Sequence, residues 1–579
     1  MYLKAKIFSL FLSLVFSFLV QAVHAEQPRA EVGHNPYGAY LSSIIAEFGE
    51  RDMRKPLVLL EAARAEDPKS KTLKLKQHYY FTLVADYDGA AFLAQELIDQ
   101  EPEGLDALTR SELQRSLYIQ AAKRGDWPLA QGFLPESEDP ASRYVYRPLF
   151  EAFSFLAQGN ANEGAEALKV LLESLGGASF LLQEVGNFYW RAGDSANALD
   201  YYKAAISRSS RDYDKDLLVM ALAAANRAGD KENYEALLES YNEAGITFKR
   251  IEDLQKAVGE GKEVVVKMEK DTRSHFALFL GKMAEPYLEQ NNVEGALTLT
   301  GMAYYLFPES DRIRLQWADL LSQVGRYNEA LEQYDFKSDE KNYTLHAALS
   351  RAQLLDHLER DAEALQLLEI LAQDFPNSPR PIERSGDIYR FNKDYTSAAK
   401  AYRRAVMLLT ENRELRYEDW PLLYAHAISL ERKGVWREAE EQFLKALELA
   451  PDQPDILNYL AYSWIDYGYK ERYAQALEML QSAVKITPDS AHIIDSLAWA
   501  YFKLGHYEEA LDNMERALER MPQDPVLNSH MGDIYWVLGR EREAAYQWKR
   551  ALMFEPDTGL LEELQTKLVQ GLNLTVQKD

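Results

Sequence analysis

The sequence contains no cysteine, and this absence removes several kinds of chemistry at once. No disulfide can form, and neither a thiolate metal site nor a cysteine nucleophile is available. We also expect no lipoprotein anchor, because its attachment requires a cysteine. A chain of 579 residues, of which 47% are hydrophobic, can be held together by a continuous core instead.

Patterns typical of catalytic or cofactor sites are also missing. The ten histidines are scattered without His-x-x-x-His or His-Glu-x-x-His spacing. No glycine-rich phosphate loop and no Gly-x-Ser-x-Gly elbow occurs. Paired acids such as Glu508 and Glu509 fall on expected helix surfaces, where solvated charge is the simplest interpretation. We therefore expect no enzyme activity, no cofactor and no metal.

Basic residues are outnumbered, with 65 Lys and Arg against 91 Asp and Glu and a formal net charge of −26. Such a surface repels polyanions, so nucleic-acid binding is not expected. Two interpretations of the acidic surplus remain open. It provides solubility for a helical surface, or it steers basic surfaces of protein partners toward the chain.

Long hydrophobic runs are absent except at the N-terminus. Lys4 and Lys6 precede the uncharged run Ile7–Val20, and small residues follow at Val23 and Ala25. This order predicts a secretory signal peptide cleaved after Ala25, and hence a periplasmic mature chain without an integral membrane segment. The alternative, an uncleaved anchor, is disfavoured because a membrane-spanning helix needs about 20 apolar residues.

The most prominent positive pattern is a repeat near the C-terminus. Similar stretches begin at Ile456, Ile493 and Leu527, and the last two are offset by 34 residues. Each stretch is followed by a glycine, two alanines and a proline, at matching distances apart from three extra residues at Tyr469–Tyr473 in the first repeat. These residues are Gly468, Gly505, Gly539, Ala476, Ala510, Ala544, Ala483, Ala517, Ala551, Pro488, Pro522 and Pro556.

The spacing within one repeat predicts two packed helices. Gly505 favours the left-handed conformation at a helix end, and Pro522 stops the second helix. Ala510 and Ala517 allow the helices to approach closely, while Met514 fills the space between them. A single helix pair cannot bury its apolar face, so successive pairs are expected to stack.

This pattern resembles the tetratricopeptide repeat. The resemblance implies an all-α fold, a right-handed helix-turn-helix solenoid of about a dozen helix pairs in two arrays. The same frame continues upstream with decreasing regularity. The predicted divisions are a signal peptide at 1–25, a degenerate helical array at 26–245, an irregular connector at 246–275, a repeat array at 276–557, and a capping helix and tail at 558–579.

Two predicted segments have alternatives. The connector holds Gly259, Gly261 and the β-branched run Val264–Val266, which suggests a short strand; a degenerate repeat is the other interpretation. The terminal segment has a leucine stripe that includes Leu564 and Leu568, and an opposite polar face that includes Lys567. It is predicted to cap the open end of the solenoid, and the alternative is a docking helix for a partner.

A binding surface is expected where the first helix of each repeat faces the concave groove. The candidate partner-binding residues are Asn458, Tyr462, His492, Asp495, Trp499, Phe502, Ser529, Asp533 and Trp536. Trp and Tyr often dominate binding energy, and the polar members can hydrogen-bond a peptide backbone or hold a basic side chain. The alternative for Trp499 and Trp536 is packing between adjacent repeats.

Length, N-terminal segment and repeats together resemble exported tetratricopeptide-repeat proteins of Gram-negative bacteria. One subgroup includes an adaptor of a carboxyl-terminal processing protease, which implies a non-enzymatic periplasmic scaffold that brings a protease to envelope proteins. That adaptor is a lipoprotein, and this chain lacks the cysteine. The alternatives are an assembly factor for outer-membrane or exopolysaccharide export, and a polysaccharide- or peptidoglycan-binding module.

Overall fold

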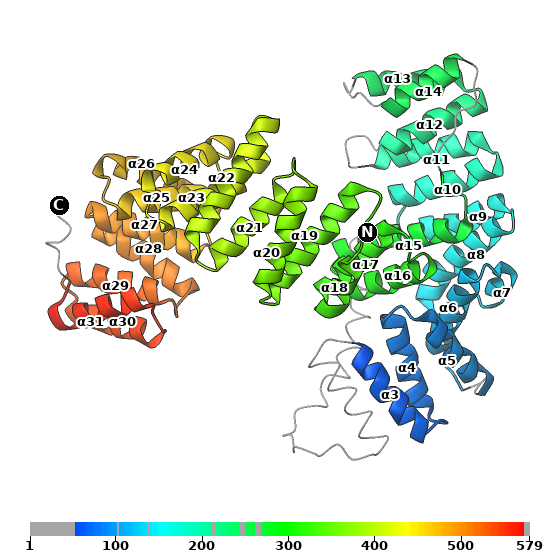
Figure 1. Cartoon of the computed structure of the whole chain (residues 1–579), viewed down its shortest axis with the longest axis horizontal. Helices are drawn as coiled ribbons and strands as arrows, with labels where there is room; N and C mark the ends of the chain where they lie inside the picture. The colour runs from blue at the N-terminus through cyan, green and yellow to red at the C-terminus, as the bar shows by residue number, and fades with distance from the viewer. Residues whose placement is uncertain are drawn as a thin grey trace. The chain divides into compact units, whose positions relative to one another are not determined.

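The computed structural model describes residues 53–100, 104–135, 138–209, 215–243, 249–260 and 268–572. Within these ranges it contains 29 α-helices and no strand, which confirms the all-α prediction (Figure 1). The chain divides into two compact units, Met1–Ser338 and Asp339–Asp579, called unit 1 and unit 2 below. The predicted signal peptide lies outside the described residues.

The helices follow one another with short connections in both units. Unit 1 holds α3 (Arg54–Glu66), α4 (Lys71–Leu83), α5 (Tyr87–Gln100), α6 (Ala107–Lys123), α7 (Trp127–Gly132), α8 (Arg147–Ala157), α9 (Ala161–Ser174), α10 (Ser179–Ala192), α11 (Ser195–Arg208), α12 (Lys215–Ala228), α13 (Lys231–Glu243), α14 (Lys249–Gly259), α15 (Thr272–Glu289), α16 (Val293–Leu306), α17 (Asp311–Gln323) and α18 (Tyr327–Tyr334). Unit 2 holds α19 (Lys341–His357), α20 (Asp361–Asp374), α21 (Arg380–Phe391), α22 (Tyr395–Asn412), α23 (Trp420–Arg432), α24 (Trp436–Leu449), α25 (Pro454–Asp466), α26 (Tyr473–Ile486), α27 (Ala491–Leu504), α28 (Tyr507–Arg520), α29 (Pro525–Val537), α30 (Glu541–Met553) and α31 (Thr558–Gln570).

Glycines on first helices make room for large aromatic side chains on the second helix of the same pair. A Cβ atom on Gly186 would lie 2.6 Å from the Tyr202 ring, and one on Gly532 would lie 2.4 Å from Trp548. Tyr202 and Trp548 are almost fully buried. Interiors packed this closely have no space for an added methyl group. The sequence pattern of small and large residues thus sets the distance between paired helices.

Backbone and side-chain caps define the helix ends. Gly505 ends α27 in the left-handed conformation with φ 82°, as its position in the repeat predicts. The Asp524 carboxylate accepts hydrogen bonds from the backbone N–H groups of Val526 and Leu527 and so caps α29. Such local signals end α27 and begin α29.

In unit 1, two late helices pack against helices that lie much earlier in the sequence. α15 contacts α8, and α16 contacts both α4 and α6. Phe276 of α15 lies among the rings of Phe150, Phe153 and Tyr118, with a 4.7 Å centroid distance to Phe153. Because one continuous core includes residues from Tyr87 to Leu320, α15 and α16 belong to the same packed body as the N-terminal helices.

The predicted irregular connector is partly helical. Its residues 249–259 form α14, whose Ile251 and Leu254 are buried against Leu218 and Leu222 of α12. The spacing of Ile251, Leu254 and Val258 on one helix face explains this packing. The run Val264–Val266, which suggested a strand, lies outside the described residues. The division between the two compact units falls between Ser338 and Asp339, after the predicted connector. The predicted domain boundaries stay predictions.

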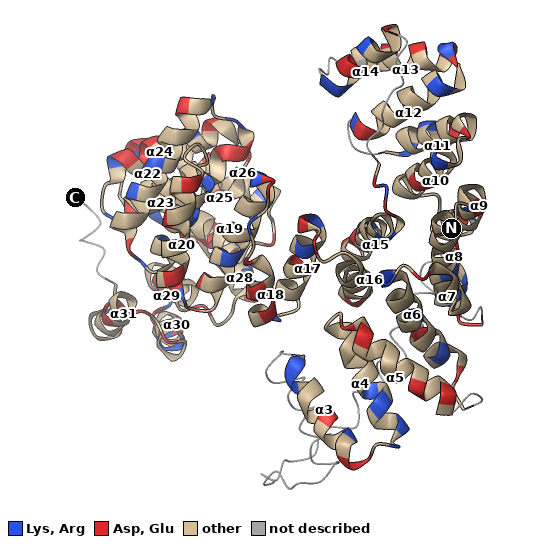
Figure 2. Cartoon of the chain, turned by 45° about the vertical axis from the view of Figure 1, so that its right-hand side comes forward, with Lys and Arg blue, Asp and Glu red and all other residues tan. Residues whose placement is uncertain are grey.

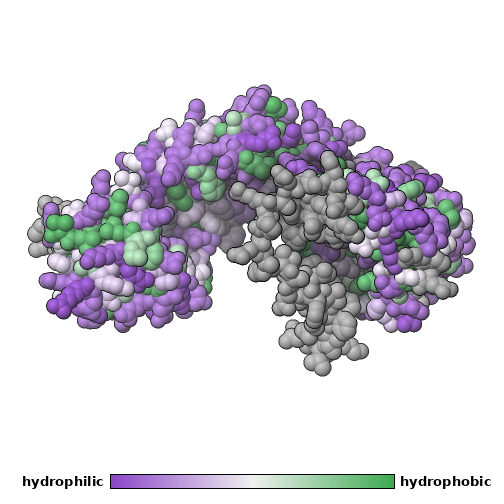
Figure 3. Space-filling model, turned by 90° about the horizontal axis from the view of Figure 1, so that it is seen from below, coloured by the Kyte–Doolittle hydropathy of each residue, from purple (hydrophilic) through white to green (hydrophobic). Residues whose placement is uncertain are grey.

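Unit 2 is a regular row in which each helix contacts the next. The extra residues of one repeat form a short 3₁₀ turn, Lys470–Arg472, and α25 still packs against α26. α31 packs on α30 through Leu564, which is fully buried with Trp548 and Ala551. The surface visible in Figure 3 is mostly hydrophilic, with hydrophobic residues in separated groups, as expected when the core takes most apolar side chains.

Candidate functional site

The nine predicted binding residues lie on three consecutive first helices, α25, α27 and α29. Their exposure differs strongly. Asp495, Trp499, Phe502, Ser529 and Asp533 are buried; Asn458, Tyr462 and Trp536 are half-buried; His492 is exposed. The structure therefore brings the predicted residues onto adjacent helices, but it uses many of them in contacts between repeats.

Trp499 packs between neighbouring repeats. Its ring stacks on Phe502 at 4.8 Å and on His530 of the next first helix at 4.1 Å, and only 7% of the residue is exposed. The Lys503 ammonium lies 4.8 Å from the ring centroid. Both ring faces are thus occupied, while the indole Nε1 is buried and has no hydrogen-bond partner.

Trp536 has a similar structural environment at the end of the array. Its ring lies 5.5 Å from Trp548, and a Cβ atom on Gly571 would lie 2.2 Å from it. The chain following α31 therefore passes close to this indole.

A buried ion pair joins α27 to α29. His530 Nδ1 lies 2.7 Å from Asp495 Oδ1. Burial lowers the pKa of His530, but the Asp495 carboxylate outweighs burial through its charge and its hydrogen bond, so the pKa is raised above 6.5. Asp495, predicted to bind a partner, thus pairs with the imidazole of the adjacent repeat.

A second buried ion pair joins α29 to α31. Lys567 Nζ lies 2.7 Å from Asp533 Oδ2, and Asp533 Oδ1 accepts a 2.9 Å hydrogen bond from Trp548 Nε1. Burial raises the pKa of Asp533, and Lys567 opposes this shift. Sequence reasoning assigned Lys567 to the polar face of the terminal helix. Its offset of 34 residues from Asp533 places it at the same repeat position, and this was the signal that could have revealed the contact.

Charged and aromatic groups converge near these pairs from three helices. Burial raises the pKa of Tyr462, as do the carboxylates of Asp466, Asp495 and Glu563. Burial lowers the pKa of Lys503, and the charges of Asp466, Asp533 and Glu563 oppose this shift. We call the surface formed by Asn458, Tyr462, Asp466, Lys503 and Glu563 the inner face. Lys503, Asp466 and Glu563 were not among the predicted site residues.

Two buried polar atoms near the inner face have no partner. They are the Asn458 Oδ1 acceptor on α25 and the Trp499 Nε1 donor on α27, and these two helices contact each other. Leaving a buried polar group without a hydrogen bond costs about 1–3 kcal/mol of folding free energy, so each such group calls for an explanation. This arrangement offers one acceptor and one donor on adjacent helices.

The remaining surface gives no sign of a metal site or membrane segment among the described residues. No group of three or more His, Cys, Asp or Glu side chains there could hold a metal ion. In the same ranges, none of the helices combines the length and apolar character needed to span a bilayer. Figure 2 shows Lys and Arg interspersed with Asp and Glu along both units.

Comparison with known families identifies the repeats. Tetratricopeptide-repeat models match residues 181–212, 382–408, 424–491 and 491–524. These matches fall on helix pairs of both units, including α10 with α11 and α27 with α28. The fold is a tetratricopeptide-type helical solenoid, as predicted. No curated protein matches the chain in sequence.

Several solved structures are similar over part or most of the chain. The Cut9–Hcn1 hetero-tetramer of the APC/C is 15% identical, with 87% of this chain and 97% of that chain covered and a TM-score of 0.37. A thermophilic tetratricopeptide-repeat protein in Thermus thermophilus is 23% identical, with 33% and 100% covered and a TM-score of 0.29. YrrB, described as having an unusual peptide-binding site, is 18% identical, with 34% and 97% covered and a TM-score of 0.27.

Proposed function

We propose that the chain is a non-enzymatic scaffold that binds segments of other proteins on the inner face of unit 2. The observation that carries this proposal is the pair of unpartnered buried atoms, Asn458 Oδ1 and Trp499 Nε1. A peptide group supplies both a donor and an acceptor, so an extended backbone can pair with both atoms once the Asn458 and Trp499 side chains turn toward it. Repeat solenoids provide long surfaces suited to such segments.

The charges of the inner face indicate which segments fit. Asp466 and Glu563 contribute two carboxylates, of which Glu563 pairs with Lys567 at 2.5 Å, and Lys503 contributes an ammonium. Tyr462 adds a half-buried aromatic surface that can cover an apolar side chain. The favoured partner segment therefore combines an extended backbone with a basic side chain, and binding weakens as salt screens these charges.

Glycan binding is less compatible with this geometry. A sugar ring would need an open aromatic face, and both faces of Trp499 are covered by Phe502 and His530. Trp536 is half-buried beside Trp548. A polypeptide partner needs only the edge of the indole and the exposed groups around it.

The experiment is affinity capture from an envelope extract with three forms of the chain. Asn458→Ala combined with Tyr462→Ala should lose the partners that the wild type captures. The matched control is Phe391→Ala, because Phe391 is 68% exposed at the end of α21 and lies outside the inner face. Equal recovery with the double variant would place binding elsewhere, and capture of glycan without protein would contradict the proposal.

We also propose that the protein works outside the cytoplasm. The run Ile7–Val20 after two lysines, with small residues near Ala25, supports this location. Cell fractionation with N-terminal sequencing tests it: the mature chain should begin at Glu26 in the periplasmic fraction. An intact N-terminus in the cytoplasmic fraction would contradict it.

A narrower proposal is that one partner is a carboxyl-terminal processing protease, for which the support is the sequence resemblance described above. In a direct binding assay, the purified protease should bind the wild type and not the Asn458→Ala/Tyr462→Ala variant. Absence of binding to the wild type would reject this partner and leave the scaffold function intact.

A further inference from the structure

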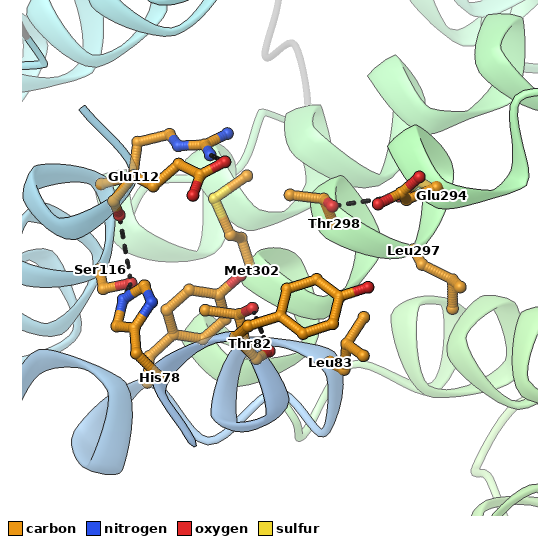
Figure 4. Close-up of a pocket in the computed structure, with 12 residues that line it drawn as sticks. His78, Thr82, Leu83, Glu112, Ser116, Glu294, Leu297, Thr298 and Met302 are labelled. Carbon is orange, nitrogen blue, oxygen red and sulfur yellow. Dashed lines mark hydrogen bonds and ion pairs between the residues drawn. The ribbon is translucent and has the colours of Figure 1, made fainter. Parts of the chain in front are cut away.

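Unit 1 contains a cavity that is separate from the inner face. It has a volume of about 100 Å³ and lies where α16 meets α4 and α6. Figure 4 shows Glu112 on one side of the cavity, Glu294 and Thr298 on the other, and Met302 between them. Its walls come from segments almost 180 residues apart in sequence, because the return of α16 creates it.

Arg115 supplies a cation that pairs with Glu112 and makes no hydrogen bond to the residues that the structure describes. Its guanidinium lies 4.3 Å from the Tyr146 ring centroid and 3.6 Å from Glu112 Oε1, and neither contact is a hydrogen bond. Only 18% of the side chain is exposed. A guanidinium has five N–H donors in a planar fork that matches a carboxylate. The side chain is thus placed to receive an acidic group from a ligand.

Carboxylates beside Arg115 supply the opposite charge. Glu112 is 48% exposed and lies next to Arg115, and Glu294 faces the cavity from α16. Burial raises the pKa of Glu112, and the Arg115 charge opposes that shift. His78 adds no charge near neutral pH, since burial and the nearby Arg115 lower its pKa to about 4. Its Nε2 lies 2.9 Å from Ser116 Oγ.

The remaining wall is mixed, with Thr82 and Thr298 beside an apolar part. Leu83, Leu297 and Met302 line it together with the buried Tyr87. An apolar cavity of about 150 Å³ holds a benzene molecule, so this smaller cavity suits a ligand of about four to six non-hydrogen atoms. Such a ligand would place a short apolar group against these side chains and its charged groups against Arg115 and Glu112.

We propose that this cavity binds a small α-amino acid in its zwitterionic form, with alanine as the best fit. The ligand carboxylate pairs with the Arg115 guanidinium. The ammonium group pairs with Glu112 and Glu294. The short side chain contacts Leu83, Leu297 and Met302. Because the site joins α16 to α4 and α6, occupancy also links the returning helices to the N-terminal ones.

Isothermal titration calorimetry of the full chain tests the requirement for both charges. L-alanine should bind the wild type. Alaninamide lacks the carboxylate and N-acetylalanine lacks the ammonium, so each should bind about tenfold more weakly or worse. Equal binding of alanine and alaninamide would reduce the cavity to a cation site and overturn the proposal, as would no heat with L-alanine at millimolar concentration.

Variants assign the charges to residues. Arg115→Gln and Glu112→Gln should each weaken alanine binding about tenfold or more. The matched control is Arg124→Gln, because Arg124 is 63% exposed and pairs with Asp88 outside the cavity. Circular dichroism melts confirm folding before titration. Unchanged binding in both folded charge variants would overturn the assignment, and the analogue series on the wild type remains decisive if Arg115→Gln fails to fold.

Discussion

The two units apply one repeat architecture in different ways. In unit 1 the helices α15 and α16 return to α8, α4 and α6, so early first helices are covered by later parts of the chain. In unit 2 each helix contacts its neighbours in the row. α31 continues this row, because its Lys567 follows Asp533 of α29 by 34 residues. Repeat spacing therefore determines how each helix pair forms. Whether the first helix of a pair is covered depends on contacts with helices that come much later in the chain.

Buried charges show the same difference. In unit 2 the pairs Asp495–His530 and Asp533–Lys567 connect consecutive first helices. In unit 1 the cavity at Arg115 lies between helices that are distant in sequence. Polar groups in unit 2 thus join adjacent repeats. Unit 1 has local pairs such as Lys74 with Glu96, and it also has pairs to a returning helix, such as Glu184 with His275 of α15.

The largest expected loss of stability comes from disrupting the packing of α15 against α8. Phe276→Ala removes a fully buried ring from the cluster with Phe150 and Phe153 and should cost about 3–5 kcal/mol. Hydrogen exchange should speed up in α8 and α15 and stay unchanged in α25–α31. The control Phe92→Ala removes a ring that is 64% exposed and should change stability by less than about 0.5 kcal/mol. Equal effects of the two variants would refute the proposed packing role.

The next effect is a pH dependence of opposite sign at two histidines. Burial lowers the pKa of His78 to about 4, so the unfolded chain takes up the proton first and stability falls between pH 6.5 and 4. This loss should reach at most roughly 3 kcal/mol. The pKa of His530 is raised by Asp495 despite burial, so its contribution is complete below 6.5 and disappears as pH rises through the folded-state pKa.

Urea unfolding at several pH values checks this prediction with His78→Gln and His530→Gln. The first variant should flatten the acid loss, and the second should flatten the loss on the alkaline side. Variants are compared instead of whole units, because burial and the charge of Arg403 also lower the pKa of His426 in unit 2 to about 4. Identical pH profiles for both variants would contradict the assignment.

A smaller effect tests the feature that the units share. Gly186→Ala in unit 1 and Gly532→Ala in unit 2 both place a methyl group against a buried aromatic ring. Each should cost about 1–3 kcal/mol through overpacking. Thermal melts should show similar losses, and hydrogen exchange should locate each loss in the unit that was changed. A neutral result at either position would mean that this pair is packed less tightly than the distances indicate.

The smallest effect is expected at the surface of unit 2. Arg403 and Glu438 form an ion pair in which both side chains are about half exposed. Arg403→Ala should therefore cost no more than about 1 kcal/mol, and the difference from wild type should shrink at high salt. A loss comparable to that of Phe276→Ala would show that surface charge, and not core packing, stabilises this region.

Sequence was sufficient where the determinants are local. Gly505, Ala510 and Met514 specify one helix pair, and the structure contains that pair. The stripe of Ile251, Leu254 and Val258 could have identified α14, but nearby glycines and valines favoured an irregular segment.

The sites were harder to predict because they depend on distant contacts. Periodicity placed Asp495 and Trp499 on the correct helix. It could not show that His530 pairs with Asp495 and stacks on Trp499. The cavity formed by Arg115 and Glu294 requires the return of α16, and the repeat pattern contains no information about that register.

The central claim, that the inner face of unit 2 holds protein segments, is tested most directly by site-specific photocrosslinking in cells. A photoreactive phenylalanine replaces Tyr462 on the inner face or, as the unit 1 control, Phe92, which is exposed on α5. The account predicts protein adducts from position 462 that disappear when Asn458→Ala is added, and none from position 92. Adducts at position 92 alone, or none at position 462 while partners are still captured, would contradict it.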